Sequence, residues 1–454
     1  MRGHGFKDAL RIVIGLLIGF SSVYFLIYPS ITVYNLVREE ASSPTDISNF
    51  AFNTHLNITS GFGDWAQDRV DSSSARDLSI SDISGTEWPM FSAVYFLWST
   101  EELDKAWVKS RRTDTPRPGV YAKEAVEAAA KLIVDPANAS WVIKHWGDKY
   151  LDTENIFYRM LLIAGLTSYQ SLSDNNQYEA VLKQQVLSLS RELDQSPYGV
   201  LDDYPGQCYP IDVLPAIAVI KRASELLNLD LGNFVQRARR GFEGKLLDPR
   251  TQLPSYIADP LKGAGIGPAR GVGISYMLIW IKDLWPETAK NWFDLYDRQF
   301  VYQTAFASGV REFSRYSRET YSWLGDVDSG PIVGGLGVAA SAFGIGAARV
   351  NGHVQLAHSL STQAMLASWP LPSGRLLMPS LLSDLSDAPY LGETALLFVF
   401  SRPKGLQRSG GELDTPILIY LVLTITLSIG LLLLFLGLRP VFRIGTRLIR
   451  PDPR

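Results

Sequence analysis

Apolar residues in the middle of this chain recur every three to four positions, which is the spacing of helices that bury one or more faces. Alternation with a period of two, typical of strands, is scarce. Helices are therefore predicted near residues 88–108, 120–134, 154–172, 177–194, 211–228, 231–246, 271–285, 287–303, 330–350, 352–367 and 390–401. The pattern predicts an all-α domain.

The predicted helices are of two alternating kinds. One kind is apolar on nearly every side, as in FSAVYFLW from Phe91 and ISYMLIWI from Ile274. The other kind is amphipathic and charged, as in AKEAVEAAAKLI from Ala122. A helix that is apolar all round must be buried, whereas an amphipathic helix covers it from outside.

The apolar helices also recur at a regular interval. Their expected starts are separated by 67, 58, 59, 57 and 65 residues, and lie at Glu87, Glu154, Asp212, Gly271, Asp328 and Glu393. Such an interval indicates repeated helical hairpins. In this repeat pattern, residues 87–405 resemble the six-hairpin barrel superfamily, which includes glucoamylase-like hydrolases, polysaccharide lyases, sugar epimerases and the linalool dehydratase-isomerase family.

The resemblance implies an (α/α)6 toroid of helical hairpins, and an open helical solenoid is the alternative. A sixth covering helix is not evident in the pattern. Either the apolar segment near the C-terminus or part of residues 57–70 would have to complete the toroid.

Two segments are apolar enough to cross a membrane, which takes about 20 residues. Residues 12–28 are almost wholly apolar, with Pro29 expected at the outer end, and residues 417–438 form a still purer apolar run. The alternative for the first segment is a cleaved signal peptide, because three basic residues precede it.

Basic residues flank both segments on the side of the chain termini, at Arg2, Lys7 and Arg11 and at Arg439, Arg443, Arg447 and Arg450. The positive-inside rule then predicts two cytoplasmic termini and an extracytoplasmic domain in the cell membrane. The expected organisation is a cytoplasmic tip and transmembrane helix (1–37), an extracytoplasmic linker or loosely packed lead-in (38–86), the helical domain (87–405), a second linker (406–416), a transmembrane helix (417–438) and a basic tail (439–454).

Composition excludes several classes of protein. A net charge of −3 gives no electrostatic footprint for nucleic acid. The single cysteine, Cys208, excludes an intramolecular disulfide. Because the sequence has no HExxH or CxxC element, no metal site is expected, with a calcium site made of carboxylates alone as the alternative. No cofactor is expected, because the glycines around Gly265, Gly267 and Gly271 do not follow a predicted strand, as a dinucleotide-binding motif would.

The densest group of chemical side chains is the segment YSWLGDVDSGP from Tyr321. Asp326 and Asp328 stand between glycines and aromatic residues just before an apolar helix, and two neighbouring carboxyl groups can divide acid and base roles. The alternative is that they build an Asx-turn and a helix N-cap.

Other acids are expected at the starts of apolar helices, where the helix dipole favours negative charge. Asp203, Asp212, Glu87 and Glu393 are the candidates, with helix capping as the alternative. Residues expected to contact a substrate are Trp88, Tyr204, Tyr209, Tyr256, Tyr321, Trp323 and Cys208. A lone cysteine can equally be an inert apolar residue.

Three functions fit these observations. The first is a carbohydrate-active enzyme of the cell envelope that uses paired carboxyl groups. The second is a dehydratase or isomerase that acts on an apolar alcohol, as the resemblance to the linalool dehydratase-isomerase family implies. The third is a membrane protein that binds glycan or scaffolds a complex without catalysis. The lipid bilayer and a glycan or an apolar small molecule are the expected partners.

Overall fold

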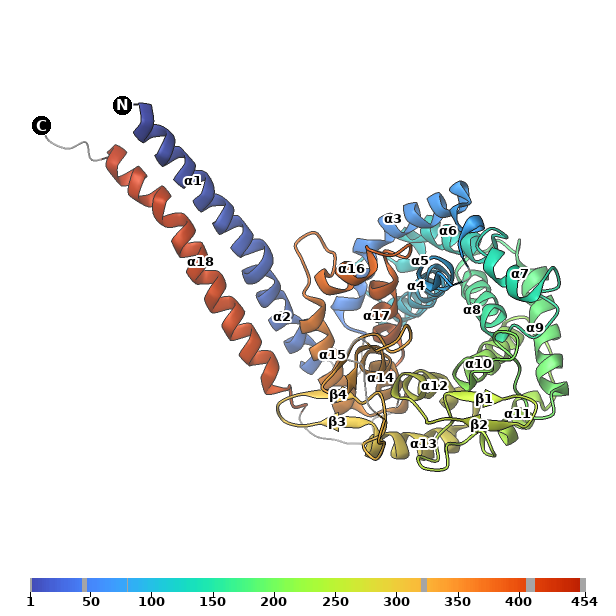
Figure 1. Cartoon of the computed structure of the whole chain (residues 1–454). Helices are drawn as coiled ribbons and strands as arrows, with labels where there is room; N and C mark the ends of the chain where they lie inside the picture. Colours follow the sequence, from blue (N-terminus) through green and yellow to red (C-terminus); the bar gives the residue numbers. More distant parts are fainter. Residues whose placement is uncertain (1, 43–46, 80, 320–324, 406–412, 450–454) are drawn as a thin grey trace, which may run out of the picture.

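Helices account for most of the chain, as the spacing of its apolar residues predicts. The fold was derived from a computed structural model, which describes residues 2–42, 47–79, 81–319, 325–405 and 413–449 (Figure 1). The predicted helices are all present, with ends that differ by a few residues except where noted below.

In the part of the chain that the structure describes, six apolar helices lie at the centre of the domain, and we call them the central helices. They are α4 (Ile83–Ser110), α8 (Ile156–Leu172), α10 (Pro210–Leu226), α12 (Gly271–Leu284), α14 (Val338–Asn351) and α17 (Leu391–Ser401). Each packs against the next one in this order, and α17 packs against α4 (Figure 1). The recurrence of apolar segments in the sequence therefore corresponds to recurrence in space.

A second set of helices packs against the outside of the central helices. The covering helices are α3 (Asn49–Ser72), α6 (Lys123–Val134), α9 (Glu179–Gln195), α11 (Phe234–Phe242), α13 (Pro286–Gln299) and α15 (Val354–Ser368). Shorter helical segments are η2 (Ser74–Asp77), α5 (Pro118–Tyr121), α7 (Ser140–Trp146) and α16 (Leu377–Ser383).

Residues 38–86, predicted to be a linker or a loosely packed lead-in, contain helix α3. It packs against α4, α6 and α17, and buries Phe50, Ile58 and Phe62 in the same hydrophobic core as the central helices. The prediction failed because these apolar residues are widely spaced among Asn, Ser and Thr. Residues 57–70, one of the two segments considered for the missing covering helix, lie within α3.

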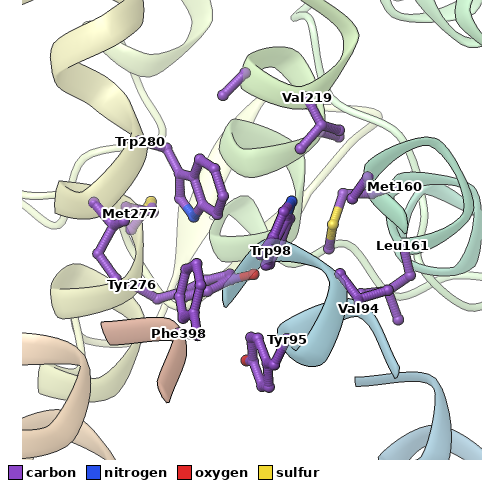
Figure 2. Close-up of a cluster of buried hydrophobic side chains, with 14 of the residues drawn as sticks. Val94, Tyr95, Trp98, Met160, Leu161, Val219, Tyr276, Met277, Trp280 and Phe398 are labelled. Atoms are coloured by element: carbon purple, nitrogen blue, oxygen red, sulfur yellow. The ribbon is translucent and has the colours of Figure 1, made fainter. Parts of the chain in front are cut away.

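Aromatic side chains fill the space between the central helices. Trp98 of α4 lies with its ring centroid 4.8 Å from that of Trp280 of α12 and 4.9 Å from that of Phe398 of α17. Tyr95 and Tyr276 complete the group (Figure 2). The interior is thus packed with side chains that come from several helices, far apart in the sequence.

Three two-stranded antiparallel hairpins, found among the described residues, interrupt the helical pattern. Their strands are β1 (Ile257–Asp259) with β2 (Ala264–Ile266), β3 (Val301–Gln303) with β4 (Ser308–Val310), and β5 (Ile332–Val333) with β6 (Leu336–Gly337).

The β5–β6 hairpin shortens the helix predicted for residues 330–350, and α14 begins only at Val338. Gly334 and Gly335 form the turn with φ values of +59° and +83°. Positive φ at both central residues defines the tight hairpin turn that glycine pairs favour. The predicted helix over 287–303 similarly ends at Gln299, before β3.

Two long helical segments near the chain termini are long and apolar enough to span a membrane. The first comprises α1 (Arg2–Ser22), a π-helical turn (Val23–Ile27) and α2 (Tyr28–Ser42), and the second is α18 (Ile417–Ile449). They pack against each other, and both chain termini lie at the same end of the pair (Figure 1). Gly15 and Gly437 face each other there, so the two backbones approach closely.

The first segment does not end at Pro29, contrary to the prediction. Proline has no N–H, so the carbonyl of Phe25 lacks its usual helical partner, and the helix widens to a π turn over Val23–Ile27. That carbonyl instead accepts a hydrogen bond of 2.8 Å from the indole N–H of Trp369 in the domain. A side chain of the domain thus provides the hydrogen bond that the proline removes.

Candidate active site

Four carboxyl groups from three separate parts of the chain lie close enough to perturb one another's ionisation. Glu87 lies in the first turns of α4, Asp203 and Asp212 lie before and within the first turn of α10, and Asp328 lies in the turn before β5. We call these four residues the acid cluster. The structure therefore brings together four of the six carboxyl groups predicted to be catalytic.

Glu87 accepts a hydrogen bond of 2.5 Å from the hydroxyl of Tyr204. Burial raises the pKa of Glu87 to about 7, and the nearby charge of Asp328 acts in the same direction, against the Tyr204 hydrogen bond. Glu87 is therefore partly protonated at neutral pH, which suits a group that must both donate and accept protons.

Asp212 and Asp203 differ in their access to water. Asp203 is 1% exposed, and its Oδ2 accepts the backbone N–H of Tyr209 at 2.6 Å. Asp212 is partly exposed, and its carboxylate accepts no hydrogen bond from any residue that the structure describes. Burial raises the pKa of both groups, and repulsion from Asp328 and Glu87 adds to the shift of Asp212. Asp212 is thus a carboxyl group open to a ligand.

Asp328 and Asp326 face different partners, although they stand two residues apart. Asp328 accepts a hydrogen bond of 2.6 Å from the hydroxyl of Tyr256. Its side chain is exposed at the surface of the site, but the surrounding protein atoms still raise the pKa of the carboxyl, and Asp326 adds repulsion. Glycines at 325 and 330, with φ of +67° and +59°, allow the backbone to turn around it.

Asp326 forms an ion pair with Arg270 at 2.7 Å and accepts the backbone N–H of Ser329 at 2.9 Å. Partial burial opposes its ionisation, but these contacts outweigh it and lower the pKa of Asp326 to about 2. Asp326 is therefore a permanent anion that shapes the turn, in line with the Asx-turn alternative, while Asp328 remains free for proton transfer.

Arg270 and Glu312 belong to this site but were not predicted. Arg270 lies just before α12, over the ring of Tyr256 at 4.4 Å, and pairs with the fully buried Glu312 at 2.7 Å. Burial raises the pKa of Glu312 to about 7 despite this ion pair. A charged residue directly before the apolar segment that begins at Gly271 was the available signal in the sequence.

Glu393 is held in a different environment. It is fully buried, forms an ion pair with Arg375 at 2.8 Å, and accepts the backbone N–H of Leu376 at 3.1 Å. Burial raises the pKa of Glu393, and the contacts with Arg375 oppose the shift. Its contacts are those of a group that fixes the loop before α16.

The aromatic candidates surround the acid cluster unequally. Tyr204 and Tyr256 hydrogen-bond to its carboxyl groups, and the ring of Tyr209 lies 5.8 Å from that of Tyr256. Trp88 is half-buried beside Glu87 in α4. Tyr321 and Trp323 lie outside the described residues.

Cys208 is fully buried, and its backbone pairs with Ala258. Burial raises the pKa of its thiol, and the neighbouring carboxylates raise it further. A thiol in this environment stays protonated and is a poor nucleophile.

This arrangement supports acid and base chemistry. Within the described part of the chain, no group of three or more His, Cys, Asp or Glu side chains has the geometry to hold a metal ion. By contrast, the pKa shifts separate the carboxyl groups into a permanent anion, Asp326, and groups that can exchange protons near neutral pH. Such separation is how active sites assign acid and base roles.

Comparison of the sequence with protein-family models finds no matching family, and comparison with curated proteins finds no significant match. A function for the chain must therefore be inferred from the chemistry of its site.

Proposed function

We propose that this protein is a membrane-anchored carbohydrate-active enzyme, a hydrolase, lyase or epimerase, whose domain is an (α/α)6 toroid. The cyclic order of contacts between the central helices and the presence of six covering helices among the described residues support the toroid. The observation that carries the function is the acid cluster, in which carboxyl groups from separate segments meet beside hydrogen-bonding tyrosines.

In the proposed reaction, Glu87 serves as the general acid. Its pKa of about 7 keeps a proton available at neutral pH. Asp328 serves as the base or nucleophile, because the Tyr256 hydroxyl stabilises its charged form. Asp212 is open to the ligand, and the charges of Asp328 and Glu87 discourage its ionisation. Tyr204, Tyr209 and Tyr256 offer rings and hydroxyls to a sugar.

The burial of Cys208 is the reason to prefer this function to a dehydratase or isomerase that acts through a thiol. If the acid cluster is only structural, the protein is expected to bind glycan without turnover.

The test of function compares three forms of the full chain in detergent, each incubated with a panel of envelope polysaccharides. The forms are the wild type, Asp328→Asn and, as a matched control, Asp174→Asn, which alters an exposed aspartate in the loop before α9. Chain length, new reducing ends and new unsaturated ends are measured. We expect the wild type and the control to act, and Asp328→Asn to lose turnover by about a hundredfold or more while its melting temperature stays nearly unchanged.

Two results would contradict the proposal. One is a wild type that alters no polysaccharide in the panel, and binding without turnover would then favour the non-catalytic alternative. The other is an Asp328→Asn variant as active as the control.

We also propose that the domain is extracytoplasmic and that both termini are cytoplasmic. The two apolar helical segments carry basic residues at their terminal ends, and those ends lie together (Figure 1). Protease added to intact cells or spheroplasts should then degrade the domain and spare tags on the two termini. A protected domain would reverse the assignment.

A further inference from the structure

Helix α16 and the turn after it expose an unusual amount of apolar surface. Met378, Leu381, Leu382 and Leu385 are 46%, 55%, 58% and 93% exposed, within eight consecutive residues. Leu381 and Leu385 also line a cavity of about 390 Å³ together with Leu371 and Leu377. We call the four exposed residues Met378, Leu381, Leu382 and Leu385 the α16 patch. Contiguous apolar surface of this kind marks a site of contact with a protein or a membrane.

The α16 patch is tied to the apolar helices near the termini. Trp369, at the end of α15, donates its indole N–H to the carbonyl of Phe25 at 2.8 Å. Leu366 and Trp369 also pack on a small core formed by Val33, Val37, Ile419 and Leu423. The chain then continues from Trp369 into α16, which lies on the side of the domain nearest to the helix pair (Figure 1).

The depth in the membrane of the contact between Phe25 and Trp369 can be estimated from its position along the first terminal segment. Phe25 is fourteen residues after Arg11, the last charged residue before Arg38. At about 1.5 Å per residue this is about 21 Å, whereas the hydrocarbon layer of a membrane is about 30 Å thick. If Arg11 lies at one membrane surface, Phe25 lies within the opposite leaflet, about 9 Å from its surface, and so does the Trp369 indole that is hydrogen-bonded to it.

From these observations we infer that the α16 patch inserts into the surface of the lipid bilayer that holds the two terminal helices. The membrane, rather than a protein partner, is the occupant because the patch continues directly from the contact between the domain and the spanning helices. This inference requires that the helices cross a membrane, but it is independent of the proposed reaction.

The charges near the patch indicate whether it needs anionic lipids. Arg375 is the only basic residue between positions 370 and 390, and it is already paired with Glu393 and Asp384. Asp387 adds a further negative charge, so the segment from 370 to 390 has no unpaired cation that would select anionic lipids. The patch is therefore expected to insert into purely zwitterionic membranes.

The experiment uses the full chain reconstituted into phosphatidylcholine vesicles. The native Cys208 is fully buried, so a thiol-reactive fluorophore reports on a cysteine introduced by Leu385→Cys or Leu382→Cys. The matched control is Leu261→Cys, because Leu261 is 88% exposed but lies in the β1–β2 turn. Emission maximum, quenching by lipids with a nitroxide on the acyl chain and quenching by aqueous iodide are measured.

We expect the labels at positions 385 and 382 to show blue-shifted emission, loss of fluorescence with nitroxide lipids and protection from iodide, relative to position 261. Labels at all three positions that respond equally to iodide would overturn the inference. Protection from both quenchers would also overturn it, because it would show that protein covers the patch.

Discussion

Replacing Glu87 by glutamine removes one negative charge from the acid cluster and keeps an oxygen that can accept the Tyr204 hydroxyl. In the folded protein, burial raises the pKa of this carboxyl from 4.5 to about 7. Each pKa unit is worth about 1.4 kcal/mol, so ionised Glu87 costs the folded state up to about 3 kcal/mol. Glu87→Gln should therefore stabilise the protein at alkaline pH.

The direction of the pH dependence follows from proton binding. Between pH 4.5 and about 7 the folded protein holds the Glu87 proton and the unfolded chain has lost it, so wild-type stability falls as pH rises through this window. The free energies of unfolding of wild type and Glu87→Gln should be similar near about pH 4, and the variant should be more stable by up to about 3 kcal/mol at about pH 8.

The assay is denaturant unfolding of the full chain in detergent, followed by tryptophan fluorescence at several pH values. Glu124→Gln is the matched control, because Glu124 is an exposed glutamate on the covering helix α6. The same variant must also lose activity if Glu87 is the general acid. The reasoning fails if Glu87→Gln is no more stable than wild type at alkaline pH, or if the difference between them does not change with pH.

Three further outcomes are expected. Turnover by the wild type should decline above pH 7, as Glu87 loses its proton at a pKa of about 7, and a pH–rate profile without this decline would remove Glu87 from the acid role. Arg270→Gln leaves the buried Glu312 without its ion pair and should destabilise the protein by about 3 kcal/mol or more at about pH 8. The loss should be smaller under acid conditions, where Glu312 is protonated, and equal losses at both pH values would contradict this. Gly437→Val should separate the terminal helices, because a Cβ at Gly437 would lie 2.5 Å from the carbonyl oxygen of Gly15. Cysteines introduced by Ser30→Cys and Thr426→Cys, whose native side chains are hydrogen-bonded, should then cross-link more slowly than without Gly437→Val. An unchanged cross-linking rate would show that the helices accommodate the side chain.

The central helices could be predicted from the sequence because a helix that is buried on every side has apolar residues at nearly all its positions. A segment such as the one from Ile274 has apolar residues on all faces, which distinguishes it from amphipathic covering helices such as α6. Helix α3 could not be predicted in this way. It buries only one face, and the polar residues between Phe52 and Phe62 hide its periodicity.

The site was predictable only in part, for a related reason. Acids at the starts of apolar helices stand out in the sequence, and Glu87, Asp212 and Asp328 do lie together. The ion pair between Arg270 and Glu312 joins residues 42 positions apart, and nothing in either local sequence identifies the other. Likewise, the different environments of Asp326 and Asp328 depend on which of them meets Arg270 and which meets Tyr256.

The position of the membrane anchor relative to the acid cluster bears on what kind of substrate the protein can accept. The first terminal segment packs on the covering helices α15 and α3. At its end, Glu40 lies 3.3 Å from Lys404 and 3.8 Å from Arg349, which is near the C-terminal end of α14. Asp328 precedes the other end of α14, a helix about 20 Å long for its 14 residues. The ion pairs of Glu40 therefore fix the end of the anchor near the C-terminal end of α14, whereas Asp328 precedes the N-terminal end of that helix. On the proposed function, a polysaccharide would approach the cluster from the end of α14 opposite to the Glu40 contact.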